Sequence, residues 1–210
     1  MNDIVSTLQK IHRSIKPLIY ERLKEFRGNT TEERIIKEFF FCLLTPQCKA
    51  KVCWDNIENL YAKGILQKGD KKTISENLYG IRFRNNKAGY ITEARNRFFN
   101  GRCSLKNIIE SNSPSTLREY LVDNVKGMGW KEASHFLRNI GKGEEFAILD
   151  RHILKGLVMC SVIDRIPESL TKTIYLDIED RMRRFAKKIH IPLSHLDFVF
   201  WYLFKKEVFK

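Results

Sequence analysis

Apolar residues recur at helical spacing along this chain of 210 residues, and no run alternates between apolar and polar side chains as a half-buried β-strand would. The spacing begins at Ile4 and is expected to break near Pro17, because proline removes a backbone donor from a helix. A second helix is predicted from the capping box Thr30-x-x-Glu33 to a stop at Pro46. Further helices are expected near 50–61, 72–79, 87–99, 104–112, 115–124, 130–140, 151–160, 171–190 and 194–206. The pattern predicts an all-α protein.

The turn from Val125 to Gly129 connects two of these helices. Gly127 and Gly129 can adopt positive φ at little steric cost, so the helices can meet in a tight hairpin. The second helix then presents its N-terminus to solvent, where unpaired amides and the positive end of the helix dipole form an anion site. Such a site holds a phosphate without reading a base, which suits nucleic acid bound independently of sequence.

The charge of the chain points in the same direction. It has 38 Lys and Arg against 25 Asp and Glu, a net charge of +13 and a pI near 9.6. Binding to a polyanion is the natural inference. The alternative is a lysine-rich surface that serves solubility or heat tolerance.

Composition also narrows the class of protein. With 43% hydrophobic residues, the chain can bury a core as one domain or as two interleaved ones. No apolar run approaches the roughly 20 residues of a membrane span, and the N-terminus lacks the order of a signal peptide, so we expect an intracellular protein of the cytoplasm or nucleoid.

The five cysteines are odd in number and contain no C-x-x-C pair, which argues for reduced thiols and against a disulfide framework or zinc site. Cys42 falls on an apolar helix face and is expected in the core. Because three cysteines fall between Cys42 and Cys53, a metal cluster remains a weak alternative.

Lys131 opens the helix that follows the hairpin. The apolar stripe of that helix consists of Ala133, Phe136, Leu137 and Ile140, and the opposite side carries Lys131, Ser134, His135 and Arg138. Lys131 is therefore either a solvated surface lysine or a cleft lysine beside a bound phosphate. In a cleft, its neutral amine would be a usable nucleophile.

Asp150 ends the apolar run Phe146-Ala147-Ile148-Leu149. It is a good N-cap for the next helix, and capping is compatible with a second role. A ten-residue helix advances roughly 15 Å, and seven extended residues can retrace roughly 23 Å, so Asp150 can lie near Lys131. A carboxylate there could hold a cation, steer a proton or stabilise positive charge on a sugar.

The segment from Leu121 to Ala133, together with Asp150-Arg151-His152, resembles the helix-hairpin-helix DNA glycosylase superfamily. Within it, the segment from Lys131 to Gly141 and the run Trp201-Tyr202-Leu203 are similar to the compact archaeal-type 8-oxoguanine DNA glycosylase/AP lyases. The resemblance covers the chain from Phe39 to Lys210. It implies two helical subdomains with a DNA-binding cleft between them. One would comprise residues 1–45 and 151–210, and the other residues 46–150, with the hairpin at about 115–141.

The resemblance also implies an activity in base excision repair. Lys131 would attack C1′ of the damaged nucleotide, displace the base and form a Schiff base, from which β-elimination cuts the strand. Asp150 would assist both steps electrostatically. The target base must leave the stack, at a cost of a few kcal/mol, so the DNA needs a wedge to fill the gap.

Two loops would supply the DNA contacts by this resemblance. Gln47 corresponds to the residue that fills the gap left by the flipped base, although a helix-stopping loop with an exposed polar tip is the alternative. Phe83 and Arg84 belong to a second loop that faces the opposite strand, and the alternative for Phe83 is an ordinary core aromatic. Lys126 would contact the phosphate backbone with Gly127 and Gly129.

Recognition of 8-oxoguanine needs an acceptor that faces its N7–H. The compact relatives imply Trp201 as a stacking platform and the terminal carboxylate of Lys210 as that acceptor. Ordinary core packing is the alternative for Trp201, because apolar residues surround it in the sequence.

No cofactor is expected to be required. The superfamily hairpin implies a structural Na⁺ or K⁺ on the backbone carbonyls of Asp123, Val125 and Met128, and no iron–sulfur cluster is expected, since no four-cysteine cluster lies near the C-terminus. The expected partner is double-stranded DNA with 8-oxoguanine or an abasic site, bound by a monomer without a membrane. The alternatives are a related glycosylase for another damaged base, or a non-catalytic DNA-binding module.

Overall fold

The computed structural model describes residues 2–99 and 104–209, and within them the regular structure is entirely helical, as the apolar spacing predicts. The helices are α1 (Asn2–Arg27), α2 (Glu32–Leu44), α3 (Ala50–Ala62), α4 (Ile65–Lys68), α5 (Lys71–Glu76), α6 (Arg84–Phe98), α7 (Leu105–Ser111), α8 (Pro114–Asn124), α9 (Trp130–Asn139), α10 (Arg151–Met159), α11 (Lys172–Lys188) and α12 (Leu193–Lys205). None of these described helices is both long enough and apolar enough to cross a membrane.

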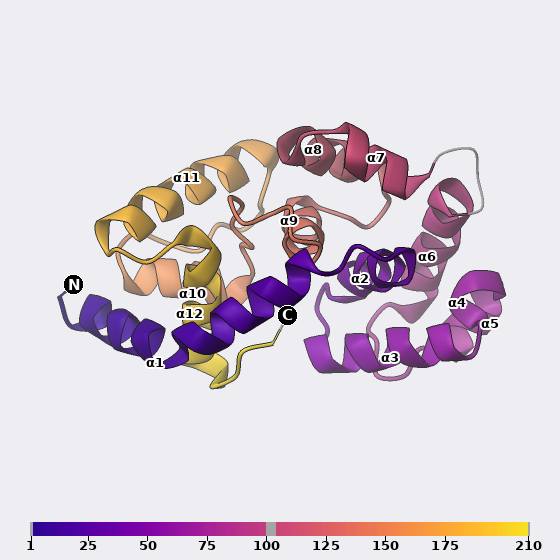
Figure 1. Cartoon of the computed structure of the whole chain (residues 1–210), viewed down its shortest axis with the longest axis horizontal. Coiled ribbons are helices and arrows are strands. Elements are labelled where there is room, and N and C mark those ends of the chain that lie inside the picture. The colour runs from indigo at the N-terminus through magenta and orange to yellow at the C-terminus, as the bar shows by residue number, and fades with distance from the viewer. Residues whose placement is uncertain (1, 100–103, 210) are drawn as a thin grey trace. The chain divides into compact units, whose positions relative to one another are not determined.

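The chain divides into two compact units. The hairpin unit, Asn29–Ile140, contains α2 to α9, and the terminal unit, Met1–Gly28 with Gly141–Lys210, contains α1 and α10 to α12 (Figure 1). These boundaries differ from those expected at 45/46 and 150/151. Helix α2 belongs to the hairpin unit because it packs against α3, α6 and α9, and the segment before α10 is hydrogen-bonded to α11.

Helix α2 lies in the core of the hairpin unit. Its consecutive residues Phe39, Phe40 and Phe41 are each at most 1% exposed, so the C-terminal half of the helix is buried on all sides. The Phe39 ring meets Phe98 of α6 and Phe136 of α9 edge-on, at centroid distances of 5.9 and 5.4 Å. These contacts fix the direction in which the C-terminal end of α2 points.

Helix α1 runs unbroken through Pro17, so the predicted break there is wrong. Pro17 lies on the exposed side of the helix, where water can satisfy the carbonyl group that its missing N–H leaves unpaired. Ile15, Ile19 and Leu23 on the other side are at most 3% exposed, and α1 packs against α12. This burial offsets the roughly 3 kcal/mol that a proline costs inside a helix.

Two smaller differences concern helix starts and short helices. The N-cap of α2 is Thr31 rather than Thr30, and its hydroxyl accepts the Arg34 N–H at 3.3 Å. The sequence pattern does not predict α4, which begins after Gly64 in the left-handed conformation. Helix α5 ends before residue 79 because the Asn56 side chain hydrogen-bonds both the N–H and the carbonyl of Tyr79.

Helix α9 departs most from its predicted amphipathic pattern. Ser134, His135 and Arg138, which the pattern places on a polar side, are each at most 5% exposed. The Ser134 hydroxyl lies 3.4 Å from Arg118, and the His135 ring packs against Phe41. The prediction that these three residues face away from packed surface is therefore wrong, because polar groups with their own partners can be buried.

In the terminal unit, α12 packs against α1, α10 and α11. A Cβ atom added at Gly156 of α10 would lie 2.4 Å from the ring of Phe200, so glycine allows the close approach of α10 to α12. His12 of α1 and His195 of α12 are hydrogen-bonded, with Nε2 and Nδ1 3.0 Å apart.

The extended segment from Phe146 to Leu149 is held by side chains of α11. Glu179 accepts the Ala147 N–H at 2.8 Å, and the Tyr175 hydroxyl donates to the Ala147 carbonyl at 2.6 Å and accepts the Leu149 N–H at 3.3 Å. The buried backbone of this segment is thus paired without a β-sheet, and its end fixes the start of α10.

Candidate active site and DNA-binding surface

The turn Val125–Gly129 joins α8 to α9 as a helix-hairpin-helix, as predicted. Gly127 has a φ of +85°, and a Cβ atom there would lie 2.3 Å from the Tyr90 ring. Gly129 has a φ of −90°, so only one of the two glycines uses the left-handed region. The turn is closed by a hydrogen bond from the Met128 N–H to the Val125 carbonyl at 3.1 Å.

The N-terminus of α9 is partly capped from within. The carboxylate of Glu132 accepts the Gly129 N–H at 3.3 Å, which satisfies one of the amides expected to face an anion. Lys126 is exposed beside the turn, 4.0 Å from Glu93.

The hairpin turn borders a hollow of about 640 Å³, which is lined by Glu93, Arg97 and residues 122–129. A second hollow, of about 380 Å³, lies at the loop before α6.

Lys131 stands in the first turn of α9 and is not a freely solvated lysine. Its side chain is 19% exposed, and its Nζ donates to the Thr45 hydroxyl at 3.1 Å. The carboxylate of Glu132 lies 3.5 Å from the same nitrogen. Of the two sequence interpretations, the structure supports the partly buried lysine, with its amine between two oxygen acceptors.

The residues after α2 form a tight turn that carries Gln47. Gln47 is exposed and has a φ of 56°, a left-handed conformation that is uncommon for a residue other than glycine. Lys87 of α6 is 3% exposed and its Nζ donates to the carbonyls of Leu44 and Pro46, both at 2.7 Å. A buried ammonium group therefore holds the turn that presents Gln47.

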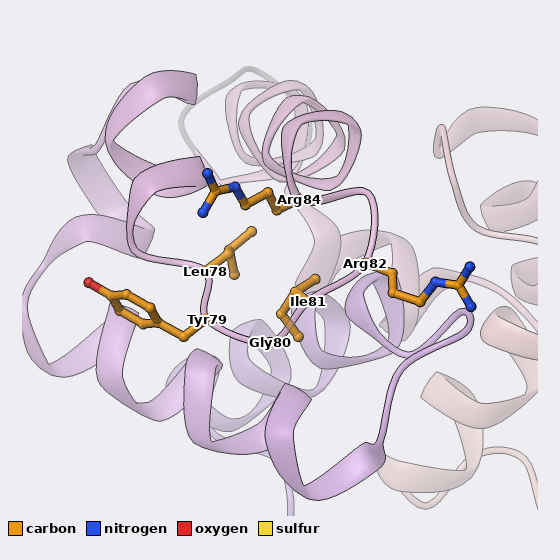
Figure 2. Close-up of a pocket in the computed structure, with 6 residues that line it drawn as sticks. All are labelled: Leu78, Tyr79, Gly80, Ile81, Arg82 and Arg84. Atoms are coloured by element: carbon orange, nitrogen blue, oxygen red, sulfur yellow. The ribbon is translucent and has the colours of Figure 1, made fainter.

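The second predicted loop, residues 80–88, is a loop only as far as Phe83, the N-cap of α6, and its remaining residues form the first turns of that helix. Figure 2 shows the pocket at this loop, lined by residues 78–82 and Arg84. Phe83 is 56% exposed with a φ of 57°, and the Arg82 guanidinium lies 5.5 Å from its ring. Ordinary core packing of Phe83 is therefore excluded. Figure 2 shows Arg82 pointing to the opposite side of the loop from Tyr79 and Arg84. The loop thus presents basic and aromatic groups on both sides.

Asp150 is the N-cap of α10, as predicted, and lies in the terminal unit. Its Oδ1 accepts the N–H groups of His152 and Ile153, both at 2.8 Å. Because both bonds use Oδ1, the half-buried carboxylate keeps Oδ2 for another group. Among the described residues of its own unit, Oδ2 accepts no hydrogen bond.

Trp201 lies on α12 close to the start of α10. The His152 ring meets it edge-on, with centroids 5.1 Å apart, and the Trp201 Nε1 has no hydrogen-bond partner among the described residues. Burial lowers the pKa of His152, while the carboxylate of Asp150 acts in the opposite direction. Trp201 keeps partial exposure, unlike the fully buried Phe200 before it. Lys210, the other predicted base-recognition residue, lies outside the described residues.

The cysteines of the described residues are free thiols: Cys42, Cys53 and Cys160 are buried and Cys48 is half-buried. Burial raises the pKa of the Cys53 thiol to about 12 and that of Cys160 to about 11. In the described part of the chain, no group of three or more His, Cys, Asp or Glu side chains could hold a metal ion. Cys103 lies outside the described residues.

The predicted cation ligands fit an alkali ion in their chemistry. Asp123, Val125 and Met128 line the hollow at the hairpin, and carbonyl oxygens are ligands that hard cations prefer. The Val125 carbonyl already accepts one N–H and retains a second lone pair.

Thr45 and Lys87 are not among the predicted site residues, although Thr45 contacts Lys131 and Lys87 contacts the turn that carries Gln47. One signal was available for Lys87. It precedes Ile91, Ala94 and Phe98 at helical spacing, so it falls on the buried stripe of α6, where a lysine needs partners. No comparable signal marks Thr45, because its contact with Lys131 joins distant parts of the chain.

Comparison with known proteins gives consistent results. A family model for 8-oxoguanine DNA glycosylase matches residues 19–191. The chain is 40% identical over 214 residues to an 8-oxoguanine DNA glycosylase/AP lyase of Fusobacterium nucleatum subsp. nucleatum, covering 100% of this chain and 99% of the relative. It is 38% identical to a protein of the same description from Methanocaldococcus jannaschii, with 99% of both chains covered.

Solved structures agree with this assignment. The crystal structure of the 8-oxoguanine DNA glycosylase of Thermotoga maritima superimposes with a TM-score of 0.88 and 34% identity, covering 100% of both chains. The Methanocaldococcus jannaschii 8-oxoguanine glycosylase/lyase, crystallised with a 15mer DNA containing 8-oxoguanine, also gives 0.88 and 34%, covering 98% of this chain and 99% of that one. With its helix-hairpin-helix, its lysine at the start of α9 and its full-length relatives, the chain belongs to the 8-oxoguanine DNA glycosylase family.

Proposed function

We propose that this protein excises 8-oxoguanine from double-stranded DNA and then cleaves the strand at the resulting abasic site. The observation that carries the proposal is the position of Lys131. Its amine emerges from the first turn of α9, directly after the hairpin, and contacts two oxygen acceptors. A hairpin that binds phosphate independently of sequence would thus place the sugar–phosphate backbone beside a primary amine.

Lys131 would act as the nucleophile. Its neutral amine attacks C1′ of the damaged nucleotide, a bond from nitrogen to C1′ forms, and the bond from C1′ to N9 breaks as the base leaves with a proton. Opening of the sugar ring gives an imine between Lys131 and C1′. Loss of a C2′ proton then expels the 3′ phosphate, and hydrolysis of the imine returns the free lysine.

Asp150 would supply a negative charge for these steps. A carboxylate that keeps one oxygen for another group can stabilise positive charge on the sugar or receive a proton. We propose that Asp150 does so when DNA is bound. The Tyr175 and Glu179 contacts that fix the segment before Asp150 would then hold this carboxylate in place.

The DNA contacts would come from the hairpin and from two loops. Lys126, Gly127 and Gly129 would bind phosphate. Gln47 would fill the gap left by the flipped base, and Phe83 with Arg84 would contact the opposite strand. The exposure of Gln47 and Phe83 on left-handed backbone supports this assignment, because such conformations recur at functional sites.

Base recognition would come from Trp201 and, in a chain that ends at Lys210, from the terminal carboxylate. Trp201 would stack on the base, and the carboxylate would accept its N7–H. Adding residues after Lys210 tests the second role. We expect the preference for 8-oxoguanine over guanine to fall, and an unchanged preference would contradict it.

At the hairpin, the carbonyls of Asp123, Val125 and Met128 would hold a Na⁺ or K⁺ ion, which would neutralise charge between turn and phosphate. Replacing both ions by a bulky ammonium salt should weaken duplex binding if this ion is present. We also propose that the protein acts as a monomer inside the cell, where its DNA substrate lies. Sedimentation with and without duplex tests the monomer.

Borohydride trapping tests the proposed reaction. Reduction converts the imine into a stable covalent adduct, so the wild-type protein should be trapped on duplex that contains 8-oxoguanine. Lys131→Gln should lose the adduct and keep duplex binding within about threefold. The matched control is Lys10→Gln, an exposed lysine on α1, which should be trapped like the wild type.

The other outcomes are equally informative. Trapping by Lys131→Gln would show that another amine is the nucleophile. An adduct with an oxidised pyrimidine but none with 8-oxoguanine would contradict the assigned base. No wild-type adduct with either lesion or with an abasic site would indicate a non-catalytic DNA-binding module.

A further inference from the structure

The turn that follows α2 lies against the candidate nucleophile. Thr45, the C-cap of α2, is 8% exposed, and its hydroxyl donates to the Cys42 carbonyl at 2.9 Å. The same oxygen accepts from the Nζ of Lys131 at 3.1 Å. A hydroxyl has one proton, and Thr45 donates it in the hydrogen bond to the Cys42 carbonyl. The Thr45 oxygen can therefore only accept a hydrogen bond from Lys131.

Resting on the proposed function, the geometry points to Thr45 as a positioning residue that orients the Lys131 amine for attack. A neutral amine has two N–H groups and one lone pair. Thr45 accepts one N–H at 3.1 Å, and the carboxylate of Glu132, 3.5 Å from the same nitrogen, attracts the N–H side of the amine electrostatically. The lone pair would then point away from both oxygens, where it is available to a sugar carbon.

Both acceptors are themselves fixed. Glu132 also accepts the Gly129 N–H at 3.3 Å, so the hairpin turn holds its carboxylate. Thr45 is fixed by its bond to α2 and by Lys87, which binds the carbonyls on either side of it, those of Leu44 and Pro46. The amine of Lys131 therefore lies between two oxygens whose positions are set by separate parts of the hairpin unit.

Lys87 differs chemically from Lys131, although the two lysines belong to the same unit. Its Nζ has three acceptors, the two carbonyls at 2.7 Å and the sulfur of Cys48 at 3.3 Å, which match the three donors of an ammonium group. A cation is also favourable at the C-terminal end of a helix such as α2. Lys87 therefore acts as the structural cation of this turn, and Lys131 remains the candidate nucleophile.

The same turn carries the proposed wedge, Gln47, two residues after Thr45. The residue that would fill the gap in the DNA and the residue that orients the nucleophile thus belong to one short segment anchored by Lys87. Insertion of Gln47 into the duplex would set the position of the Lys131 amine relative to the flipped nucleotide.

Replacing the hydroxyl tests the proposal. Thr45→Val keeps the shape of the side chain and removes the acceptor, whereas Thr45→Ser keeps the acceptor and removes a methyl group. We measure the rate of borohydride trapping on duplex with an abasic site at saturating DNA, and separately the duplex Kd. Thr45→Val should lower the trapping rate about tenfold, which corresponds to about 1.4 kcal/mol of barrier, with a Kd within about twofold. Thr45→Ser should restore most of the rate.

Thr92→Val is the matched control. The Thr92 hydroxyl of α6 also donates to a backbone carbonyl, that of Ala88 at 2.8 Å, but among the described residues it makes no hydrogen bond to the candidate site. Its loss should leave the trapping rate at the wild-type value. If Thr45→Val unfolds, Thr45→Ala against Thr45→Ser makes the same comparison without a β-branched side chain.

Each remaining outcome has one meaning. Wild-type trapping with equal rates for Thr45→Val and wild type would overturn the positioning role and leave the proposed function intact. Equal losses in Thr45→Val and Thr45→Ser would assign the effect to packing and also overturn it. The absence of an adduct with the wild-type protein would instead contradict the proposed function itself.

Discussion

Gly127 is subject to two separate constraints, a backbone conformation and a close neighbour. Its φ is +85°, and a Cβ atom would lie 2.3 Å from the Tyr90 ring. Gly64 has a φ of +68° with nothing within 4 Å of such an atom. We therefore expect Gly64→Ala to cost about 1 kcal/mol of unfolding free energy and Gly127→Ala clearly more, because it adds a steric clash.

The variants Gly64→Ala and Gly127→Ala also distinguish an effect on stability from an effect on DNA binding. Gly127→Ala should also weaken binding to undamaged duplex, since the clash displaces the hairpin turn, while Gly64→Ala should bind like the wild type. Thermal unfolding and fluorescence anisotropy measure the two effects. Equal losses of stability in both variants would mean that the Tyr90 ring moves aside freely.

The buried His12 and His195 pair makes a prediction about pH. Burial lowers the pKa of His195 to about 4, with His12 and Lys16 acting in the same direction and Glu144 opposing them. In the unfolded chain the pKa is about 6.5, so below that pH the unfolded state binds a proton that the folded state does not. The contribution of His195 to stability is therefore complete above pH 6.5 and falls as the pH drops toward 4.

The loss assigned to His195 should be at most about 3 kcal/mol. His195→Gln keeps a donor and an acceptor but does not titrate, so its unfolding free energy should fall less between pH 7.5 and pH 4.5 than that of the wild type. Denaturant unfolding at both values measures this difference.

At the scale of elements, α11 positions the segment that leads to Asp150. The Tyr175 hydroxyl pairs with the Ala147 carbonyl and the Leu149 N–H, at 2.6 and 3.3 Å. Tyr175→Phe leaves both buried backbone groups without this partner, so we expect a loss of about 2 kcal/mol in unfolding free energy. Tyr20→Phe is the control, since Tyr20 is 51% exposed.

Activity should respond to the same variant. A displaced segment moves the carboxylate of Asp150, and the trapping rate on abasic duplex should fall severalfold at a temperature where Tyr175→Phe is fully folded. A wild-type trapping rate in the folded variant would show that Asp150 is held by its own cap on α10.

The elements that the sequence predicts well are those whose signals are local. Apolar spacing located most helices, and the glycines of the turn located the hairpin between α8 and α9. The break at Pro17 failed because packing of α1 on α12 outweighs a local preference. The polar side of α9 failed because Ser134 and His135 are buried with partners that only the fold supplies.

The same difference between local signals and long-range contacts applies to the residues of the candidate site. Lys131 and Asp150 are identified by motifs that are short in sequence, and the structure gives each a local role, at the start of α9 and as the cap of α10. Thr45 and Lys87 could not be identified from the sequence because their contacts join distant residues. Thr45 and Lys131 are 86 positions apart, and Lys87 and Leu44 are 43 positions apart. Hydrogen bonds between distant segments leave no periodic signal in one sequence.

At the scale of the whole molecule, the net charge of +13 makes a prediction about salt. Binding to duplex DNA should weaken linearly in log Kd against log salt concentration, because each neutralised phosphate releases counterions. Lys126 is exposed beside the hairpin, so Lys126→Gln should reduce the magnitude of the slope by about one. Lys10→Gln removes the same charge from α1 and should keep the wild-type slope. If both variants change the slope equally, the protein attracts DNA through its overall charge, and Lys126 makes no phosphate contact of its own.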